Sequence, residues 1–256
     1  MVTLEQRKTE KRIEQEIIKY RKKSITKREA NNNIQKIIDE AFERGIFTKK
    51  DIDGLNYRRD KKNMRSYVDF WNNICESQEK EHIIFLDLIE KIEEKYEKVE
   101  WETYGTDIKG GVIIASFKER IDSPNLPDYK VKINNKICLV ESKSFLSKKG
   151  QVFKRNNLEM YKKQKAFLIV GINGYLFLYK PKAIDKLLSL RSKGSQIGGK
   201  PAIRVGNDLN CEISLDFLQK EKLVKKIQSN WAENFKKTKN KKKTGNNKYI
   251  FIDYII

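Results

Sequence analysis

Two acidic residues and a lysine stand close together in residues 127–143, which read PDYKVKINNKICLVESK. Asp128 lies near the start of this segment, and Glu141 and Lys143 lie at its end. Carboxylates are ligands that hard cations such as Mg²⁺ prefer. A nearby lysine can orient or deprotonate a water molecule, or stabilise developing negative charge. These residue types together suit metal-assisted hydrolysis of a phosphodiester bond.

A β-hairpin within this segment would bring the three side chains together. Residues 130–133 alternate lysine with valine or isoleucine, and residues 137–140 form a short apolar run. The two asparagines at residues 134–135 tolerate the positive φ of a tight hairpin turn. With these residues at the turn, Asp128 lies opposite Glu141, at a Cβ separation of about 4.5–5.5 Å. The lysine two residues further on points to the same face as Glu141.

The segment begins with Pro127-Asp128 and, after twelve further residues, ends with Glu141-Ser142-Lys143. This arrangement resembles the PD-(D/E)xK nuclease superfamily, which includes many type II restriction endonucleases. The resemblance implies a Mg²⁺-dependent nuclease that hydrolyses DNA through a metal-activated water. It also implies that Asp128, Glu141 and the backbone carbonyl of Ser142 contact metal, and that Lys143 assists the nucleophile.

Acid-x-lysine triplets are common in a chain with 55 Lys+Arg and 35 Asp+Glu, so this one can also arise by chance. Other triplets begin at Asp60, Glu93, Asp107 and Asp128. Only the triplet at Glu141 follows a four-residue apolar run and has a Pro-Asp pair one hairpin upstream. The alternative to a nuclease site is a solvated hairpin that carries surface charge.

A strong amphipathic helix is expected at residues 79–99. Its apolar stripe consists of Phe85, Leu88, Ile92, Tyr96 and Val99. Glu81 lies on the same stripe, four residues before Phe85. The resemblance implies a further metal-linked glutamate on a helix that precedes the aspartate, with Glu81 as the first candidate and Glu90 as the second. Either residue can instead be an ordinary surface acid.

Apolar strands at residues 99–104, 111–117, 166–170 and 175–179 accompany the hairpin, and a helix is expected at residues 151–165. Strand, helix and strand in this order allow a parallel crossover after the hairpin. The predicted fold class is therefore α/β, a mixed β-sheet with a catalytic antiparallel hairpin flanked by helices. The predicted division is a helical N-terminal region at 1–78, a nuclease core at 79–190 and a basic C-terminal extension at 191–256.

The N-terminal region is predicted to be helical. A charged surface helix or arm at 3–20, an amphipathic helix at 26–44, a capping box at Thr48–Asp51 and a helix at 64–74 are expected. These helices can read DNA as a helix-turn-helix or serve only for packing.

The C-terminal region shows strand-like alternation at 210–218 and a helical pattern at 223–235. A run with seven lysines and no acid follows at 236–248, of a kind that is usually flexible. An apolar strand at 249–256 is expected to pack or to form a subunit interface.

The formal net charge of +20 and the pI near 9.6 favour a polyanionic partner. Several cations are candidates for contacting DNA, or are simply solvated. They are Lys148, Lys149, Lys154, Arg155, Arg191, Lys193 and Lys200.

Several other chemistries are disfavoured. The three cysteines are far apart, which argues against zinc and suits a reducing cytoplasm. His82 is the single histidine and is interpreted as an ordinary helix residue. Residues 194–200 nearly match a phosphate loop, but Pro201 replaces the hydroxyl residue, so no nucleotide cofactor is expected. No membrane-spanning or secretory segment is expected either.

The sequence therefore predicts a Mg²⁺-dependent DNA endonuclease of restriction–modification type, a cytoplasmic homodimer that cuts double-stranded DNA at a specific site. Junction-resolving, repair and transposition nucleases share the motif. A non-catalytic nucleic-acid-binding protein is the alternative from a different class.

Overall fold

The computed structural model describes residues 3–59, 66–105, 126–145, 150–172, 174–194, 196–197 and 200–243. The expected strands at 111–117 and 249–256, and the loop residues Lys148 and Lys149, lie outside the described residues. Two compact units are distinguished. The first is built mainly from residues up to Glu79, and the second comprises Lys80–Gly105 and Pro127–Phe235.

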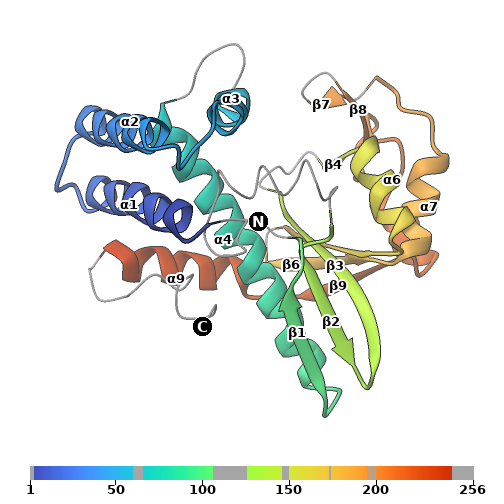
Figure 1. Ribbon diagram of the computed structural model, residues 1–256. Helices are drawn as coiled ribbons and strands as arrows, with labels where there is room; N and C mark the ends of the chain where they lie inside the picture. Colours follow the sequence, from blue (N-terminus) through green and yellow to red (C-terminus); the bar gives the residue numbers. More distant parts are fainter. Residues whose placement is uncertain are drawn as a thin grey trace. The chain divides into compact units, whose positions relative to one another are not determined.

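The first unit is helical. It contains α1 (Leu4–Arg21), α2 (Lys27–Glu43), α3 (Lys49–Arg58) and the beginning of α4 (Tyr67–Glu93), as Figure 1 shows. A threonine precedes each of the first three helices and forms a capping box with the third residue of that helix. The box expected at Thr48 and Asp51 is confirmed. These boxes satisfy backbone donors that the first turn of a helix leaves without partners.

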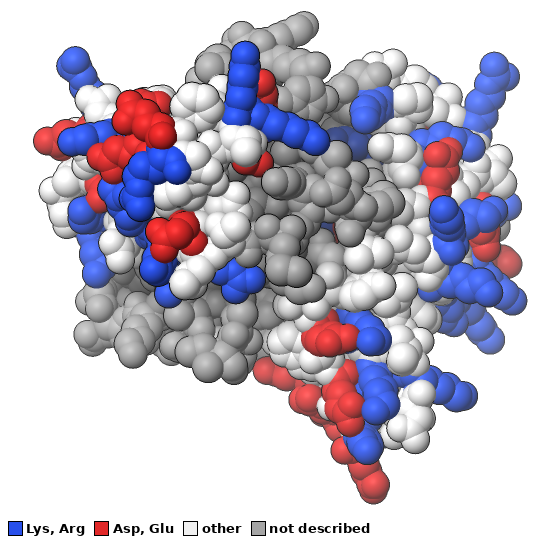
Figure 2. Space-filling model, viewed as in Figure 1, with Lys and Arg blue, Asp and Glu red and all other residues white. Residues whose placement is uncertain are grey.

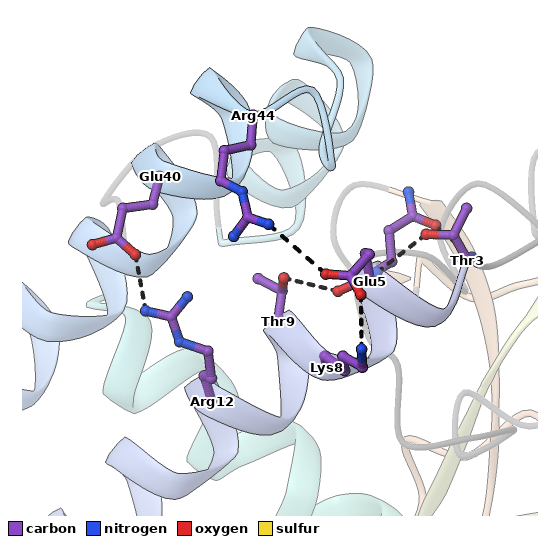
Figure 3. A network of polar contacts seen from close by, with 8 residues as sticks. Thr3, Glu5, Lys8, Thr9, Arg12, Glu40 and Arg44 are labelled. Atoms are coloured by element: carbon purple, nitrogen blue, oxygen red, sulfur yellow. Dashed lines mark hydrogen bonds and ion pairs between the residues drawn. The ribbon is translucent and has the colours of Figure 1, made fainter.

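Helix α1 packs against α2 rather than extending as an arm. Its buried residues include Ile13 and Ile17. Exposed ion pairs lie at the edge of this contact. The Arg12 guanidinium is 2.8 Å from Glu40 Oε2, and Lys8 Nζ is 2.9 Å from Glu5 Oε1 (Figure 3). Exposed ion pairs of this kind contribute little to stability. The apolar contacts between α1 and α2 therefore contribute most of the free energy that holds the two helices together.

The second unit is organised around a six-stranded mixed sheet in the order β1-β2-β3-β5-β6-β9. Its strands are β1 (Val99–Thr103), β2 (Tyr129–Ile133), β3 (Lys136–Ser144), β5 (Phe167–Ile172), β6 (Tyr175–Tyr179) and β9 (Val224–Gln228). Strands β3 and β5 are parallel, and the other neighbours are antiparallel. The α/β class and the mixed sheet flanked by helices are thus confirmed.

A smaller sheet has the order β4-β8-β7. It is formed by β4 (Gln151–Lys154), β8 (Lys200–Val205) and β7 (Gln196–Ile197). The remaining helices are α6 (Arg155–Lys163), α7 (Pro181–Ser189), α8 (Leu215–Lys220) and α9 (Trp231–Lys243). Within the described residues, no helix combines the length and apolar character needed to cross a membrane.

The hairpin β2–β3 has the predicted turn and register. Asn134 and Asn135 adopt φ of 45° and 67°, and Ile133 pairs with Lys136 across the turn. The chain then passes through α6 and returns in β5 parallel to β3, as predicted. The small amide side chains tolerate this left-handed backbone, which lets the turn close without glycine.

Two apolar layers cover the sheet. One, shared with α4, includes Ile84, Phe85, Val140 and Ile169. The other, shared with α6 and α7, includes Leu158, Ile184, Leu168 and Val170. Successive residues of β5 enter opposite layers, so this strand is buried on both faces. That explains its unbroken apolar run.

Several predicted boundaries are wrong. The helices expected at 64–74 and 79–99 are one helix, α4, because no glycine or proline interrupts the sequence between them. Residues 151–154 are strand rather than helix because they pair with β8. Gln196–Ile197 and Lys200–Val205 form strands in and after the segment that nearly matches a phosphate loop.

The C-terminal part of the second unit departs from its pattern as well. Residues 224–228, predicted to be helical, form β9 beside β6. The strand expected at 210–218 is wrong in its second half, where α8 begins after its N-cap residue Ser214. The start of the lysine run, through Lys243, is helical in α9. In the case of β9, pairing with the sheet overrides the local helical period.

The close packing of β5 against α4 generates a stability prediction. A methyl group at Gly171 would overlap Ile84 Cδ1 and lie 2.9 Å from Trp231 Cε2. We expect Gly171→Ala to destabilise the second unit by roughly 1–3 kcal/mol through overpacking. Thermal unfolding measures this. Ile84→Ala in the same chain should recover part of the loss, and simple additivity of the two changes would contradict the explanation.

Candidate active site

Four ionisable side chains of the second unit meet at one end of the β2–β3 hairpin. Asp128 lies at the bend before β2, Glu141 and Lys143 lie in β3, and Glu81 lies on α4. The Lys143 Nζ is 2.7 Å from Glu141 Oε1, 3.6 Å from Glu81 Oε2 and 3.9 Å from Asp128 Oδ2. The ammonium group therefore lies among three carboxylates that come from three elements.

The backbone around Ser142 holds two of these acids in place. The Ser142 N–H donates to Asp128 Oδ2 at 2.9 Å, and its hydroxyl donates to the carbonyl of Glu81 at 2.6 Å. Ser142 is fully buried, and both bonds run from it to half-buried residues. On the other side, the Tyr104 N–H donates to the Asp128 carbonyl at 2.8 Å. The aspartate is thus fixed by both neighbouring strands.

Of the two glutamates considered on the helix, only Glu81 joins the cluster. Glu90 is exposed, nine residues further along α4, which is about 13 Å along the helix axis. The helix approaches the hairpin near its Glu81 turn, where Ser142 binds the backbone. Sequence spacing alone could not distinguish the two, because the distinction depends on where the helix crosses the strands.

Tyr161 of α6 belongs to the site, although it was not among the candidate site residues that the sequence suggested. Its hydroxyl donates to Glu141 Oε1 at 2.6 Å, and its side chain is buried. The available signal was weak but physical, because the hydroxyl of a buried tyrosine usually needs a polar partner. Glu141 thereby receives donors from both Lys143 and Tyr161.

The acids carry an unfavourable excess of negative charge. Burial raises the pKa of Asp128 well above its ordinary range, and repulsion by Glu141 adds to this shift. Burial also raises the pKa of Glu81, although attraction to Lys143 opposes it. For Lys143, burial alone lowers the pKa, but attraction to Glu141, Glu81 and Asp128 outweighs it and leaves the pKa well above its usual value. Lys143 is therefore a cation at neutral pH.

The donor set has the chemistry of a divalent-cation site, but its present arrangement does not form one. Among the described residues, no three His, Cys, Asp or Glu side chains are grouped so as to hold a metal ion. The Lys143 ammonium lies in the space between the acids instead. Fully ionised, the three acids and the lysine carry a net charge of −2, which matches a divalent ion. Binding would require Lys143 to move away from Glu141.

The nominated DNA-contact residues have varied environments. The Arg155 guanidinium donates to the carbonyls of Leu188 and Leu190 at the end of α7, and Lys193 Nζ donates to the carbonyl of Cys211. These two cations thus help to hold loops of the second unit. Arg191 and Lys200 are exposed, whereas Lys154 is half-buried. Figure 2 shows Lys and Arg side chains gathered over the α6 and α7 part of this unit.

The repulsion among the acids predicts a stabilising substitution. Asp128→Asn removes one half-buried charge and retains an oxygen that can accept from Ser142. We expect the melting temperature without divalent cations to rise by a few degrees, since about 1 kcal/mol corresponds to roughly 2–4 °C in a domain of this size. Asp185→Asn is the matched control, because Asp185 is exposed and pairs only at the surface with Lys162. A lower melting temperature for Asp128→Asn would contradict this account.

The burial of these acids, together with the repulsion between them, gives the wild-type protein a pH dependence of known sign. The folded chain retains protons on Asp128 and Glu81 at a pH where the unfolded chain has already lost them, because both pKa values are raised. Stability from this source therefore increases as the pH falls from neutral toward the ordinary carboxyl pKa of about 4. Melting curves of wild type and Asp128→Asn between these limits should converge as the pH falls, and parallel curves would argue against it.

Comparison with known proteins gave no match to a protein-family model, to a curated protein or to a solved structure.

Proposed function

We propose that this chain is a Mg²⁺-dependent endonuclease that hydrolyses phosphodiester bonds in double-stranded DNA. The observation that supports it most is the Lys143 ammonium among Asp128, Glu141 and Glu81. Ion pairs that merely stabilise a fold are usually simple pairs at the surface, whereas this cluster concentrates acids around one lysine in a partly enclosed position. Side-chain exposure within it is only 8% for Glu141 and 28% for Lys143.

Asp128 and Glu141 would hold the cation, together with the Ser142 carbonyl and Glu81. A bound Mg²⁺ supplies Lewis-acid stabilisation of phosphate charge and lowers the pKa of a water ligand. The chain's own contribution is positional. Ser142 fixes the Asp128 carboxylate and the backbone at Glu81, and Tyr161 fixes the Glu141 carboxylate. Because Asp128 and Glu141 are already held by these contacts, their carboxylates would lose little freedom when a cation binds.

Lys143 would exchange its partners when substrate binds. Its three carboxylate contacts keep it protonated while the acids are otherwise uncompensated. Once those charges are neutralised, the attraction that raises its pKa weakens, and Nζ can turn toward the attacking water or a phosphate oxygen. There the ammonium can donate a hydrogen bond, or, once it has released its own proton to solvent, the amine can accept the proton that the water loses.

The substrate class is supported by charge. A net charge of +20 favours association with a polyanion, although it does not distinguish one nucleic acid from another. A restriction-type enzyme that acts as a homodimer on a two-fold symmetric site is the form we propose. Junction-resolving, repair and transposition nucleases would use the same cluster on differently shaped DNA. A non-catalytic DNA-binding protein is the remaining candidate, and divalent-cation dependence separates it from all of them.

The proposal is tested by incubating large mixed-sequence DNA and a branched DNA with the protein in Mg²⁺, in EDTA, and with Asp128→Ala in Mg²⁺. We expect cutting only by the wild type in Mg²⁺. Discrete fragments indicate a sequence-specific enzyme, and a smear indicates a non-specific or repair nuclease. No cutting of either DNA, or equal cutting by Asp128→Ala, would leave the binding-protein alternative in front.

A second measurement separates catalysis from binding. We expect Lys143→Ala to slow cleavage by about 10²–10⁴-fold, the usual range for loss of a group that transfers a proton. Binding of DNA in EDTA should change by only a few-fold, because one of many cations is lost. Lys136→Ala is the matched control, since Lys136 is exposed at the opposite end of the same strand. If both substitutions slowed cleavage equally, Lys143 would have no specific role in the cleavage step.

A further inference from the structure

Each of two acids in the candidate site is followed by a buried residue, and these two residues contact one another. His82 follows Glu81 on α4, and Tyr129 follows Asp128 at the start of β2. The His82 Nδ1 and the Tyr129 hydroxyl are 3.0 Å apart and hydrogen-bonded. This bond joins positions that are 47 residues apart in the chain. It therefore connects the helix to the hairpin at the level of the acids.

Packing holds the Tyr129 ring rigidly. The ring is 1% exposed and stacks on Phe85, with centroids 3.6 Å apart and planes inclined by 5°. Trp101 of β1 meets both rings edge-on, at centroid distances of 5.2 Å and 6.3 Å. His82 lies against the same group, 6.0 Å from the Tyr129 ring. Aromatic contacts of this geometry leave the tyrosine hydroxyl little freedom to move.

The hydrogen bond between His82 and Tyr129 lies where it can influence the positions of the two neighbouring acids. Successive side chains of a strand point to opposite faces, so Tyr129 faces α4 while Asp128 faces the cluster. A second bond, from the Ser142 hydroxyl to the Glu81 carbonyl, joins α4 to β3. Together with the apolar packing of α4 against the sheet, these two bonds tie the turn of the helix that carries Glu81 to the segments that carry Asp128 and Ser142.

We propose that His82 and Tyr129 are a positioning pair that sets the spacing of Glu81 and Asp128 for a shared divalent cation. This rests on the proposed function, because without a cation the spacing has no consequence. Metal sites require ligand positions within a few tenths of an ångström, and residues that orient ligands typically change metal affinity by 10–100-fold when lost. The two residues would act through the positions of their neighbours and would not themselves hold the cation.

The test uses the full chain without DNA and measures Mn²⁺ binding by electron paramagnetic resonance of the free ion. Tyr129→Phe deletes a single oxygen, and His82→Gln replaces the ring. Tyr179→Phe is the matched control. Tyr179 is likewise fully buried, and its hydroxyl donates to Gln151 in the apolar layer that α6 and α7 share with the sheet. Thermal unfolding of each variant is recorded in parallel.

We expect Tyr129→Phe and His82→Gln each to raise the Mn²⁺ dissociation constant by about tenfold. The double variant should bind no more weakly than the single ones, because the two residues act through one bond. Tyr179→Phe should bind within about twofold of the wild type, even if its melting temperature falls equally. If His82→Gln does not fold, Tyr129→Phe decides the matter alone.

Two results overturn the inference and leave the proposed function standing. They are unchanged Mn²⁺ affinity in Tyr129→Phe, or an equal loss in Tyr179→Phe, which would trace the effect to general loosening of the core. Absence of Mn²⁺ binding in the wild type is a different failure. It removes the cation from the proposed function itself, and the positioning role falls with it.

Discussion

The attraction between one lysine and three carboxylates governs the second unit. Removing four charges from bulk water is unfavourable, and three of them repel one another. Lys143 offsets part of this cost, and the hydrogen bonds that Ser142 and Tyr161 donate offset a further part. A remainder of negative charge persists, and it adds to the effect of burial in raising the pKa of Asp128. Selection for stability alone would not retain this excess of negative charge, which is why we connect the cluster with function.

The sheet supplies the rigidity that such a cluster needs. Strand β3 lies between β2 and β5. It pairs with β2 as far as Val140, and Glu141 and Ser142 pair with β5. Helix α4 covers one face and α6 covers the other, and each delivers a polar group to the same end of β3. Glu81 arrives from the first helix and Tyr161 from the second. The site therefore depends on both apolar layers at once.

Basic residues in this unit serve two purposes. Arg155 satisfies carbonyl groups at the end of α7, where the helix leaves them without internal partners. Lys193 does the same for a loop near Cys211. Other cations remain exposed over α6 and α7, where they add to the positive field that a polyanion would meet. Composition alone does not separate these roles, because an interior contact and a solvated charge use the same residue types.

The sequence by itself determined the hairpin and what its end carries. Alternation, two asparagines and an apolar run specify the register, and the register puts Asp128 beside Glu141 and Lys143. These are local interactions over a few residues. Tertiary structure alone decided the rest. The point where α4 crosses the strands brings Glu81, and not Glu90, to the cluster. The packing of α6 places Tyr161 beside Glu141, and pairing with β6 makes residues 224–228 a strand. Such contacts join distant parts of the chain, and no local period encodes them.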